Sequence, residues 1–168
     1  MTDTLAPALP DGLDAEVEAV LRQVCDRDLK LVTAESCTGG LLASLLTDVT
    51  GCSHAFERGF VTYTNAAKHE LLGVAEALLE DPGPVSEPVA KAMAEGALRR
   101  SGGDIAIAVT GFAGPAGPDD QPGLVHFATA VRSGPTLHRR CRFKEQDRAG
   151  VRLRSIEVAL EMLRERLT

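Results

Sequence analysis

Ser36 lies where an α/β protein would carry a nucleophilic hydroxyl group. It follows a short apolar strand expected over residues 31–34, and Thr38, Gly39 and Gly40 precede a helical pattern. Open α/β sheets present ligand sites at such strand-to-helix turns. Backbone N–H groups at the helix start can stabilise an oxyanion, and these three residues leave room for a ligand beside the main chain. The alternative is that Ser36 or Thr38 only caps the helix, since neither a G-x-S-x-G turn nor a Ser-His-Asp set is evident.

Lys68 is the candidate base for this serine. It follows Asn65, the expected helix cap, by three residues. Burial and the positive end of the helix both disfavour an ammonium group there, which would lower the lysine pKa toward the range where a neutral amine accepts a proton. Tyr63, the only tyrosine, could donate a hydrogen bond to Ser36, to Lys68 or to the leaving group. The alternative for Lys68 is an exposed surface lysine, and the alternative for Tyr63 is a half-buried aromatic residue of a strand.

Thr110 and Gly111 form a second candidate site at the end of an apolar strand expected over residues 105–110. They lead into residues 111–123, which contain four glycines and three prolines and therefore predict a long loop. Long ordered loops in small domains are usually functional. The Thr110 hydroxyl and the Gly111 N–H are expected at a sheet edge where a substrate could lie, although a simple turn role is an alternative.

The elements that must position these residues alternate along the chain. Apolar periodicity and turn residues predict helices over residues 13–28, 41–51, 65–73, 86–97 and 146–167, and strands over residues 31–34, 60–64, 105–110, 124–131 and 137–143, the last two as an antiparallel hairpin. This order predicts an α/β fold: a single-domain three-layer α/β/α sandwich with a mixed central sheet. The domain is expected over residues 13–168, after a loose N-terminal segment at residues 1–12.

Composition narrows the functional classes. The four cysteines lack CxxC spacing and the four histidines are isolated, so we expect neither a metal site nor a disulfide framework. No apolar run is long enough to cross a bilayer, and the N-terminus lacks the pattern of a secretory signal. The expected location is the cytoplasm, without a membrane partner.

Charge is distributed unevenly around a net value of -6. Up to Val131 there are 8 basic and 19 acidic residues, whereas from Arg132 onward there are 10 basic and 5 acidic residues. A basic region on an acidic protein suits a small phosphate-bearing ligand better than nucleic acid, which the remaining surface would repel. A solvated arginine-rich surface is an equal alternative for most of these arginines.

Three strings along the chain carry a family resemblance. They are AESCTGG at residues 34–40, VTYTNAAK at residues 61–68 and VTGFAGP at residues 109–115. At these strings and over nearly the whole chain from Leu13 to Leu167, the sequence resembles the CinA C-terminal domain family, whose characterised members are nicotinamide-nucleotide amidohydrolases. Two departures from the family pattern are Glu57-Arg58 before Gly59, and Gln146 in the place of a glycine.

The resemblance implies a serine-lysine amidase that splits nicotinamide mononucleotide into nicotinate mononucleotide and ammonia, in pyridine nucleotide salvage and without a cofactor. Ser36 and Lys68 fall at the positions of the dyad, and Tyr63 and Thr110 at supporting positions. Arg148 and Arg152 lie in a segment that resembles the family's basic stretch, which makes either one a candidate phosphate ligand.

The resemblance further suggests a homo-oligomer whose partner is a small pyridine mononucleotide. Two other functional hypotheses stay open at this point. One is a catalytically silent nucleotide-binding module of the same fold, and the other makes Cys37 the nucleophile in place of Ser36.

Overall fold

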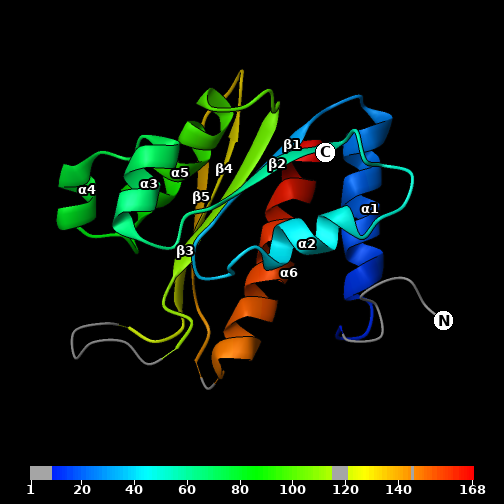
Figure 1. Cartoon of the computed structure of the whole chain (residues 1–168). Helices are drawn as coiled ribbons and strands as arrows, with labels where there is room; N and C mark the ends of the chain where they lie inside the picture. Colours follow the sequence, from blue (N-terminus) through cyan, green and yellow to red (C-terminus); the bar gives the residue numbers. More distant parts are fainter. Residues whose placement is uncertain (1–8, 115–120, 145) are drawn as a thin grey trace.

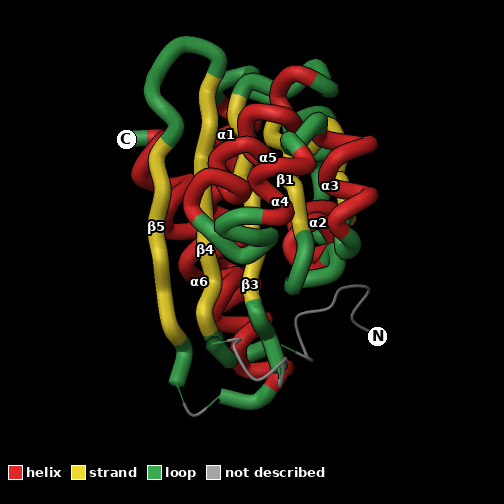
Figure 2. The backbone as a smooth tube through the Cα atoms, turned by 90° about the vertical axis from the view of Figure 1, so that its left-hand side faces the viewer, coloured by secondary structure: helices red, strands yellow, loops and turns green. Residues whose placement is uncertain are grey.

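A five-stranded mixed sheet forms the centre of the computed structural model, which describes residues 9–114, 121–144 and 146–168. Its strand order is β2-β1-β3-β4-β5. The bounds are β1 Leu31–Glu35, β2 Phe56–Val61, β3 Ile105–Gly111, β4 Leu124–Val131 and β5 Leu137–Arg142. Figure 2 shows β5, β4, β3 and β1 side by side, from left to right. β1 is parallel to β2 and β3, whereas β4 is antiparallel to both β3 and β5. The three parallel strands therefore end at the same edge of the sheet.

Helices cover both faces of this sheet (Figure 1). One face carries α1 Leu13–Asp26, α2 Leu41–Thr47 and α6 Arg148–Leu167, and the other carries α3 Asn65–Leu72, α4 Glu76–Glu80 and α5 Glu87–Arg99. The predicted three-layer α/β/α sandwich with a mixed sheet is confirmed, and so is the predicted hairpin of β4 and β5.

Strand alternation divides the core into two clusters. In β3, Ile105, Ile107 and Val109 pack with α1, α2 and α6, whereas Ala106 and Ala108 pack with α5. Side chains of a strand point alternately to opposite faces, so a strand covered on both faces contributes side chains to both clusters. The same alternation places two neighbouring residues at the end of β1, Glu35 and Ser36, on opposite faces.

The segment around Tyr63 differs from the sequence-based expectation. β2 covers Phe56–Val61 rather than residues 60–64, so Tyr63 lies beyond the strand. The cap of α3 is Thr64, whose Oγ1 accepts a hydrogen bond from the Ala67 N–H at 3.1 Å, and not Asn65. The β-branched and aromatic residues at 61–64 gave a stronger strand signal than the charged edge strand before them. Short α4 was not predicted at all.

The expected loop and N-terminal segment are only partly described. β3 extends through Gly111, and the Phe112 N–H donates to the Leu124 carbonyl oxygen at 2.9 Å. Residues 115–120 of the predicted loop lie outside the described residues, as do residues 1–8 of the predicted N-terminal segment. Leu9 packs against the core cluster of α1, α2 and α6. Within the described parts, none of the helices has both the length and the apolar composition needed to cross a membrane.

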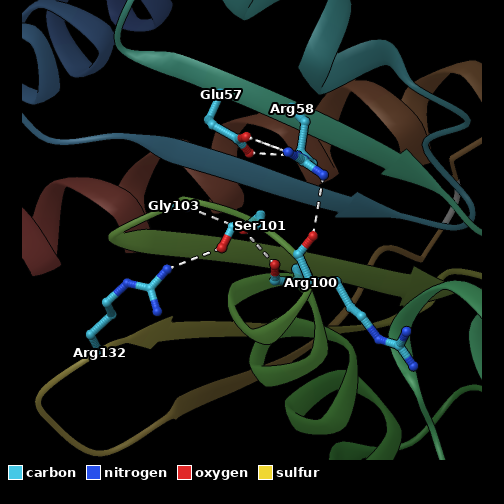
Figure 3. Close-up of polar contacts among 7 residues, drawn as sticks. Glu57, Arg58, Arg100, Ser101, Gly103 and Arg132 are labelled. Carbon is cyan, nitrogen blue, oxygen red and sulfur yellow. Dashed lines mark hydrogen bonds and ion pairs between the residues drawn. The ribbon is translucent and has the colours of Figure 1, made fainter.

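Glu57 and Arg58, which depart from the family pattern, lie near the start of β2. Their side chains form an ion pair at 2.6 Å, and Arg58 Nη1 donates to the Arg100 carbonyl oxygen at 3.2 Å (Figure 3). Arg132 reaches the Ser101 carbonyl oxygen in the same region, just beyond α5. In the sheet Arg58 pairs with Val32, three residues before the end of β1. This departure therefore lies away from the strand ends described next.

Candidate active site

Ser36 begins the turn that joins β1 to α2. Its backbone N–H donates to the Val109 carbonyl oxygen at 2.9 Å, which ties the turn to the neighbouring strand β3. Gly39 and Gly40 follow with φ values of 60° and 90°, in the left-handed region that glycine adopts at low steric cost. These glycines turn the chain into α2, and the Ser36 side chain contacts α3 on the opposite face of the sheet.

Lys68 reaches Ser36 from α3. Its Nζ donates to Ser36 Oγ at 2.9 Å, a distance that meets the expectation for a nucleophile and its base. The same nitrogen lies 2.9 Å from the Thr62 carbonyl oxygen and 3.4 Å from that of Tyr63. Lys68 is only 1% exposed, although lysine is almost never fully buried without a reason.

Burial shifts the proton equilibrium of Lys68. It lowers the pKa of the amine to about 8, and the nearby Cys37 acts weakly in the opposite direction. A neutral amine can donate two N–H groups to the carbonyl oxygens of Thr62 and Tyr63. In this neutral form the lone pair would face the Ser36 hydroxyl, which would then donate to Nζ, as a general base requires.

A pocket opens over this pair and brings most of the predicted site residues together. Six of them line it: Ser36, Tyr63, Lys68, Thr110, Gly111 and Arg148. The remaining lining residues are Cys37, Asn65, Pro84, Val85, Phe112, Ala113 and Gly114. The other residues expected to bind substrate, which do not line this pocket, are Thr38, Gly39, Gly40 and Arg152.

Thr110 and Tyr63 contribute differently to the walls. Thr110 is 1% exposed and its hydroxyl donates to the Pro84 carbonyl oxygen at 2.8 Å, so it fixes the segment that precedes α5. Tyr63 is 63% exposed, and its hydroxyl has no hydrogen-bond partner among the described residues. Tyr63 contacts Lys68 through its main-chain carbonyl oxygen and not through its side chain.

The two candidate arginines occupy different environments. Arg148, the first residue of α6, lines the pocket and lies against Gly114, where a Cβ would be 2.8 Å from Arg148 Nη2. Arg152 instead donates from Nη2 to the Thr38 carbonyl oxygen at 2.9 Å. Of the two, Arg148 is therefore the one that lines the pocket, and Arg152 bonds to the turn that follows Ser36.

The amides at the start of α2 are already occupied. Leu42 N–H and Ala43 N–H donate to the Glu35 carboxylate at 3.0 and 2.8 Å, and Leu41 N–H donates to the Thr38 carbonyl oxygen. The expectation that the helix start would hold an oxyanion is therefore wrong for these amides. Among the described residues, the Cys37 N–H makes no hydrogen bond to another residue, and it directly follows the serine.

Cys37 is a poor candidate for the nucleophile. It is 7% exposed, and burial raises the pKa of its thiol to about 12. Nucleophilic cysteines react as thiolates, which this environment suppresses. Among the described residues, no group of three or more His, Cys, Asp and Glu side chains is arranged to hold a metal ion.

Sequence reasoning missed the structural role of Glu35 and the pocket position of Asn65. Glu35 was part of the AESCTGG string, and a carboxylate at the end of a buried strand was an available signal. Asn65 was interpreted as the cap of α3, a role that Thr64 performs. Asn65 is instead the first residue of α3 and lines the pocket.

The fold and the site define an α/β protein with a buried serine-lysine pair at the carboxyl end of its central parallel strand. The model of the CinA C-terminal domain matches residues 14–167. The chain belongs to the CinA C-terminal domain family.

Curated relatives support this membership. A CinA-like protein of Akkermansia muciniphila is 55% identical over 134 residues, which make up 79% of this chain and 31% of that protein. A nicotinamide-nucleotide amidohydrolase PncC of Enterobacter agglomerans is 46% identical over 151 residues, with 89% of this chain and 90% of that protein covered. The chain thus spans about a third of the CinA-like relative and nearly the whole of the PncC relative.

Solved structures show the same fold. The competence/damage inducible protein CihA of Agrobacterium tumefaciens aligns with a TM-score of 0.90 at 43% identity, covering 94% of this chain and 96% of that chain. A competence or damage-inducible protein of Enterobacter asburiae aligns with a TM-score of 0.88 at 32% identity, covering 95% and 100%.

Proposed function

We propose that this chain hydrolyses the carboxamide of nicotinamide mononucleotide to nicotinate mononucleotide and ammonia, with Ser36 as nucleophile. The observation that carries the proposal is the 2.9 Å contact between Lys68 Nζ and Ser36 Oγ in a pocket that also contains Arg148. The choice of substrate is supported by the PncC relative, which the chain matches over nearly its full length.

The first half of the reaction forms an ester on Ser36. Neutral Lys68 takes the hydroxyl proton while Ser36 Oγ attacks the carboxamide carbon, giving a tetrahedral oxyanion. The Cys37 N–H, as the amide that follows the nucleophile, is the proposed oxyanion donor. Collapse of this intermediate breaks the C–N bond, and the Lys68 ammonium returns its proton to the leaving nitrogen, which departs as ammonia.

The second half restores the enzyme. Lys68 is again neutral and takes a proton from a water molecule, whose oxygen attacks the ester carbon. Collapse breaks the bond to Ser36 Oγ, the lysine proton returns to that oxygen, and nicotinate mononucleotide is released. One water is consumed and one ammonia is formed in each cycle.

Arg148 and Tyr63 are assigned to the substrate rather than to the proton transfers. Arg148 is the proposed phosphate ligand because its guanidinium lies at the pocket and a guanidinium pairs well with phosphate oxygens. The exposed Tyr63 ring lies on the pocket wall, where it can cover the pyridine ring or donate to the leaving group.

Ammonia release from nicotinamide mononucleotide tests the proposal. The wild type should release one ammonia for each nicotinate mononucleotide, and Ser36→Ala should release none above background. Ser44→Ala, which removes an exposed hydroxyl on α2, is the matched control and should keep wild-type activity. Binding of the mononucleotide without ammonia release by the wild type would instead support a silent nucleotide-binding module.

A further inference from the structure

Glu35 is a buried carboxylate that the proposed reaction does not use. It is the last residue of β1, it is 0% exposed, and it directly precedes Ser36. Among the described residues, no lysine, arginine or histidine forms an ion pair with it. A buried carboxylate without a cation is costly unless hydrogen bonds satisfy its oxygens, so its contacts should explain why it is there.

Both oxygens of Glu35 contact the start of α2. Oε2 accepts from the Leu42 N–H at 3.0 Å and Oε1 accepts from the Ala43 N–H at 2.8 Å. The residue that precedes α2 is Gly40, which has no side chain to cap the helix. Leu42 and Ala43 are the second and third residues of α2, whose N–H groups a cap normally satisfies. Glu35 therefore caps α2 from the other side of the turn.

These contacts close the turn that carries Ser36. At one end Glu35 is held in the middle of the sheet, where it pairs with Val61 on β2 and Val109 on β3. At the other end its side chain holds Leu42 and Ala43. The turn between β1 and α2 is therefore attached to Glu35 twice, through its backbone in the sheet and through its side chain at the start of α2.

The start of α2 also packs closely on the edge strand. At Gly59 of β2, a Cβ atom would lie 3.1 Å from Ala43 Cβ and 2.9 Å from Thr33 Oγ1. The missing side chain of Gly59 allows α2 to approach the sheet to within reach of Glu35. This leaves little room for α2 to shift without loss of the two hydrogen bonds.

We propose that Glu35 is a positioning residue that anchors the start of α2 to the end of β1 and thereby holds Ser36 Oγ at Lys68 Nζ. The anchoring rests on the two hydrogen bonds of the carboxylate, and its effect on turnover rests on the function proposed above. Small displacements of a nucleophile from its base are enough to reduce a rate by about 100-fold.

Two substitutions separate the parts of this proposal. Glu35→Ala removes both acceptors, whereas Glu35→Gln keeps the side-chain size and one carbonyl acceptor but turns an N–H group toward the second amide. Glu80→Gln, at an exposed carboxylate on α4, is the charge control. Leu98→Ala, at a buried position of α5 itself, shows what a loss of stability alone does to turnover.

Amide hydrogen exchange tests the anchoring without reference to turnover. In Glu35→Ala the Leu42 and Ala43 amides should exchange at least about tenfold faster than in the wild type, while strands β3 and β4 stay protected. Glu35→Gln should show a smaller increase. Unchanged exchange of these two amides in folded Glu35→Ala would overturn the proposal, whether or not the wild type is an amidase.

Kinetics test the positioning. Glu35→Ala should lower kcat about 100-fold and Glu35→Gln about 10-fold, with KM changed less than about threefold, because the pocket walls remain in place. The pH midpoint of kcat should not move in Glu35→Gln, since burial sets the Lys68 pKa. A loss of activity in Glu35→Ala no larger than in Leu98→Ala, at equal fractions of folded protein, would reduce Glu35 to a structural role and overturn the proposal. Absence of amidase activity in the wild type would instead overturn the proposed function.

Discussion

Lys68 Nζ lies 2.9 Å from Ser36 Oγ and contacts main-chain carbonyl oxygens, and no acidic side chain of the described residues forms an ion pair with it. An adjacent carboxylate would stabilise the ammonium and raise the pKa of the lysine, which would oppose its use as a base. Carbonyl oxygens orient the amine without a full opposing charge. Burial can then keep a useful fraction of the amine neutral near neutral pH.

The pH dependence of turnover should follow Lys68. Because the reaction requires the neutral amine, kcat should rise with pH through a midpoint near the Lys68 pKa of about 8. Rates across pH 6 to 10 measure this midpoint. Lys68→Arg should be inactive at every pH, since a guanidinium stays protonated. Lys91→Arg, at a half-buried lysine of α5 that forms an ion pair with Glu87, should titrate like the wild type. A profile that is flat from about pH 7 to pH 9 would count against a lysine base.

Burial of Lys68 should also cost stability below its folded pKa. The unfolded chain binds more protons at this residue between pH 8 and pH 10.5, so the free energy of unfolding should rise with pH in that window. Over the whole window the gain is about 3 kcal/mol, to order of magnitude. Urea unfolding measures the free energy of unfolding of the wild type and of Lys68→Met. The wild-type value should rise relative to the Lys68→Met value from pH 8 to pH 10. A difference independent of pH would contradict the lowered pKa.

Much of the site was predictable because its residues follow strand ends. Ser36 directly follows β1 and Thr110 lies next to the last residue of β3, and because these strands are parallel neighbours, their proximity follows once the topology is known. The position of Lys68 in the first turn of a helix made it a candidate base for Ser36, but an exposed lysine was an open alternative until the family resemblance was added.

Other features depended on tertiary contacts that local sequence does not encode. Arg148 and Arg152 are one helical turn apart on α6, yet one lines the pocket and the other bonds to the Thr38 carbonyl oxygen. The role of Glu35 depends on how closely α2 approaches β2 at Gly59. The start of β2 was missed because its charged residues suit an exposed edge strand and weaken the apolar pattern.

Arg148 should distinguish substrates by their phosphate group. Arg148→Ala should raise KM for nicotinamide mononucleotide about 10- to 100-fold, which corresponds to the loss of one charge-assisted contact. KM for nicotinamide riboside, which has no phosphate, should change little. Arg152→Ala should instead lower kcat for both substrates alike, because Arg152 bonds to the turn after Ser36. Equal losses for the two substrates in Arg148→Ala would contradict the phosphate assignment.

Gly114 should matter through Arg148. A methyl group at Gly114 would lie within 2.8 Å of Arg148 Nη2, so Gly114→Ala should displace the guanidinium from its place. We expect the same loss of preference for the phosphorylated substrate as in Arg148→Ala, and no further loss when the two substitutions are combined. Additive effects in the double variant would show that Gly114 acts on something other than Arg148.

Cys37 should be dispensable for the chemistry. Because burial raises the pKa of its thiol to about 12, Cys37→Ala should retain most of the turnover and the pH midpoint of the wild type. Ammonia release and thermal unfolding of this variant separate an effect on chemistry from an effect on packing. Abolished turnover in a variant that is as stable as the wild type would return Cys37 to consideration as the nucleophile.

The most direct measurement is to trap the covalent intermediate. Wild-type protein mixed with nicotinamide mononucleotide, quenched in acid within one turnover and digested, can be analysed by mass spectrometry for an acylated peptide. The account predicts an ester on Ser36 that is absent in Ser36→Ala and disappears from the wild type when substrate is exhausted. Acylation of Cys37, or ammonia release by Ser36→Ala at the wild-type rate, would contradict it.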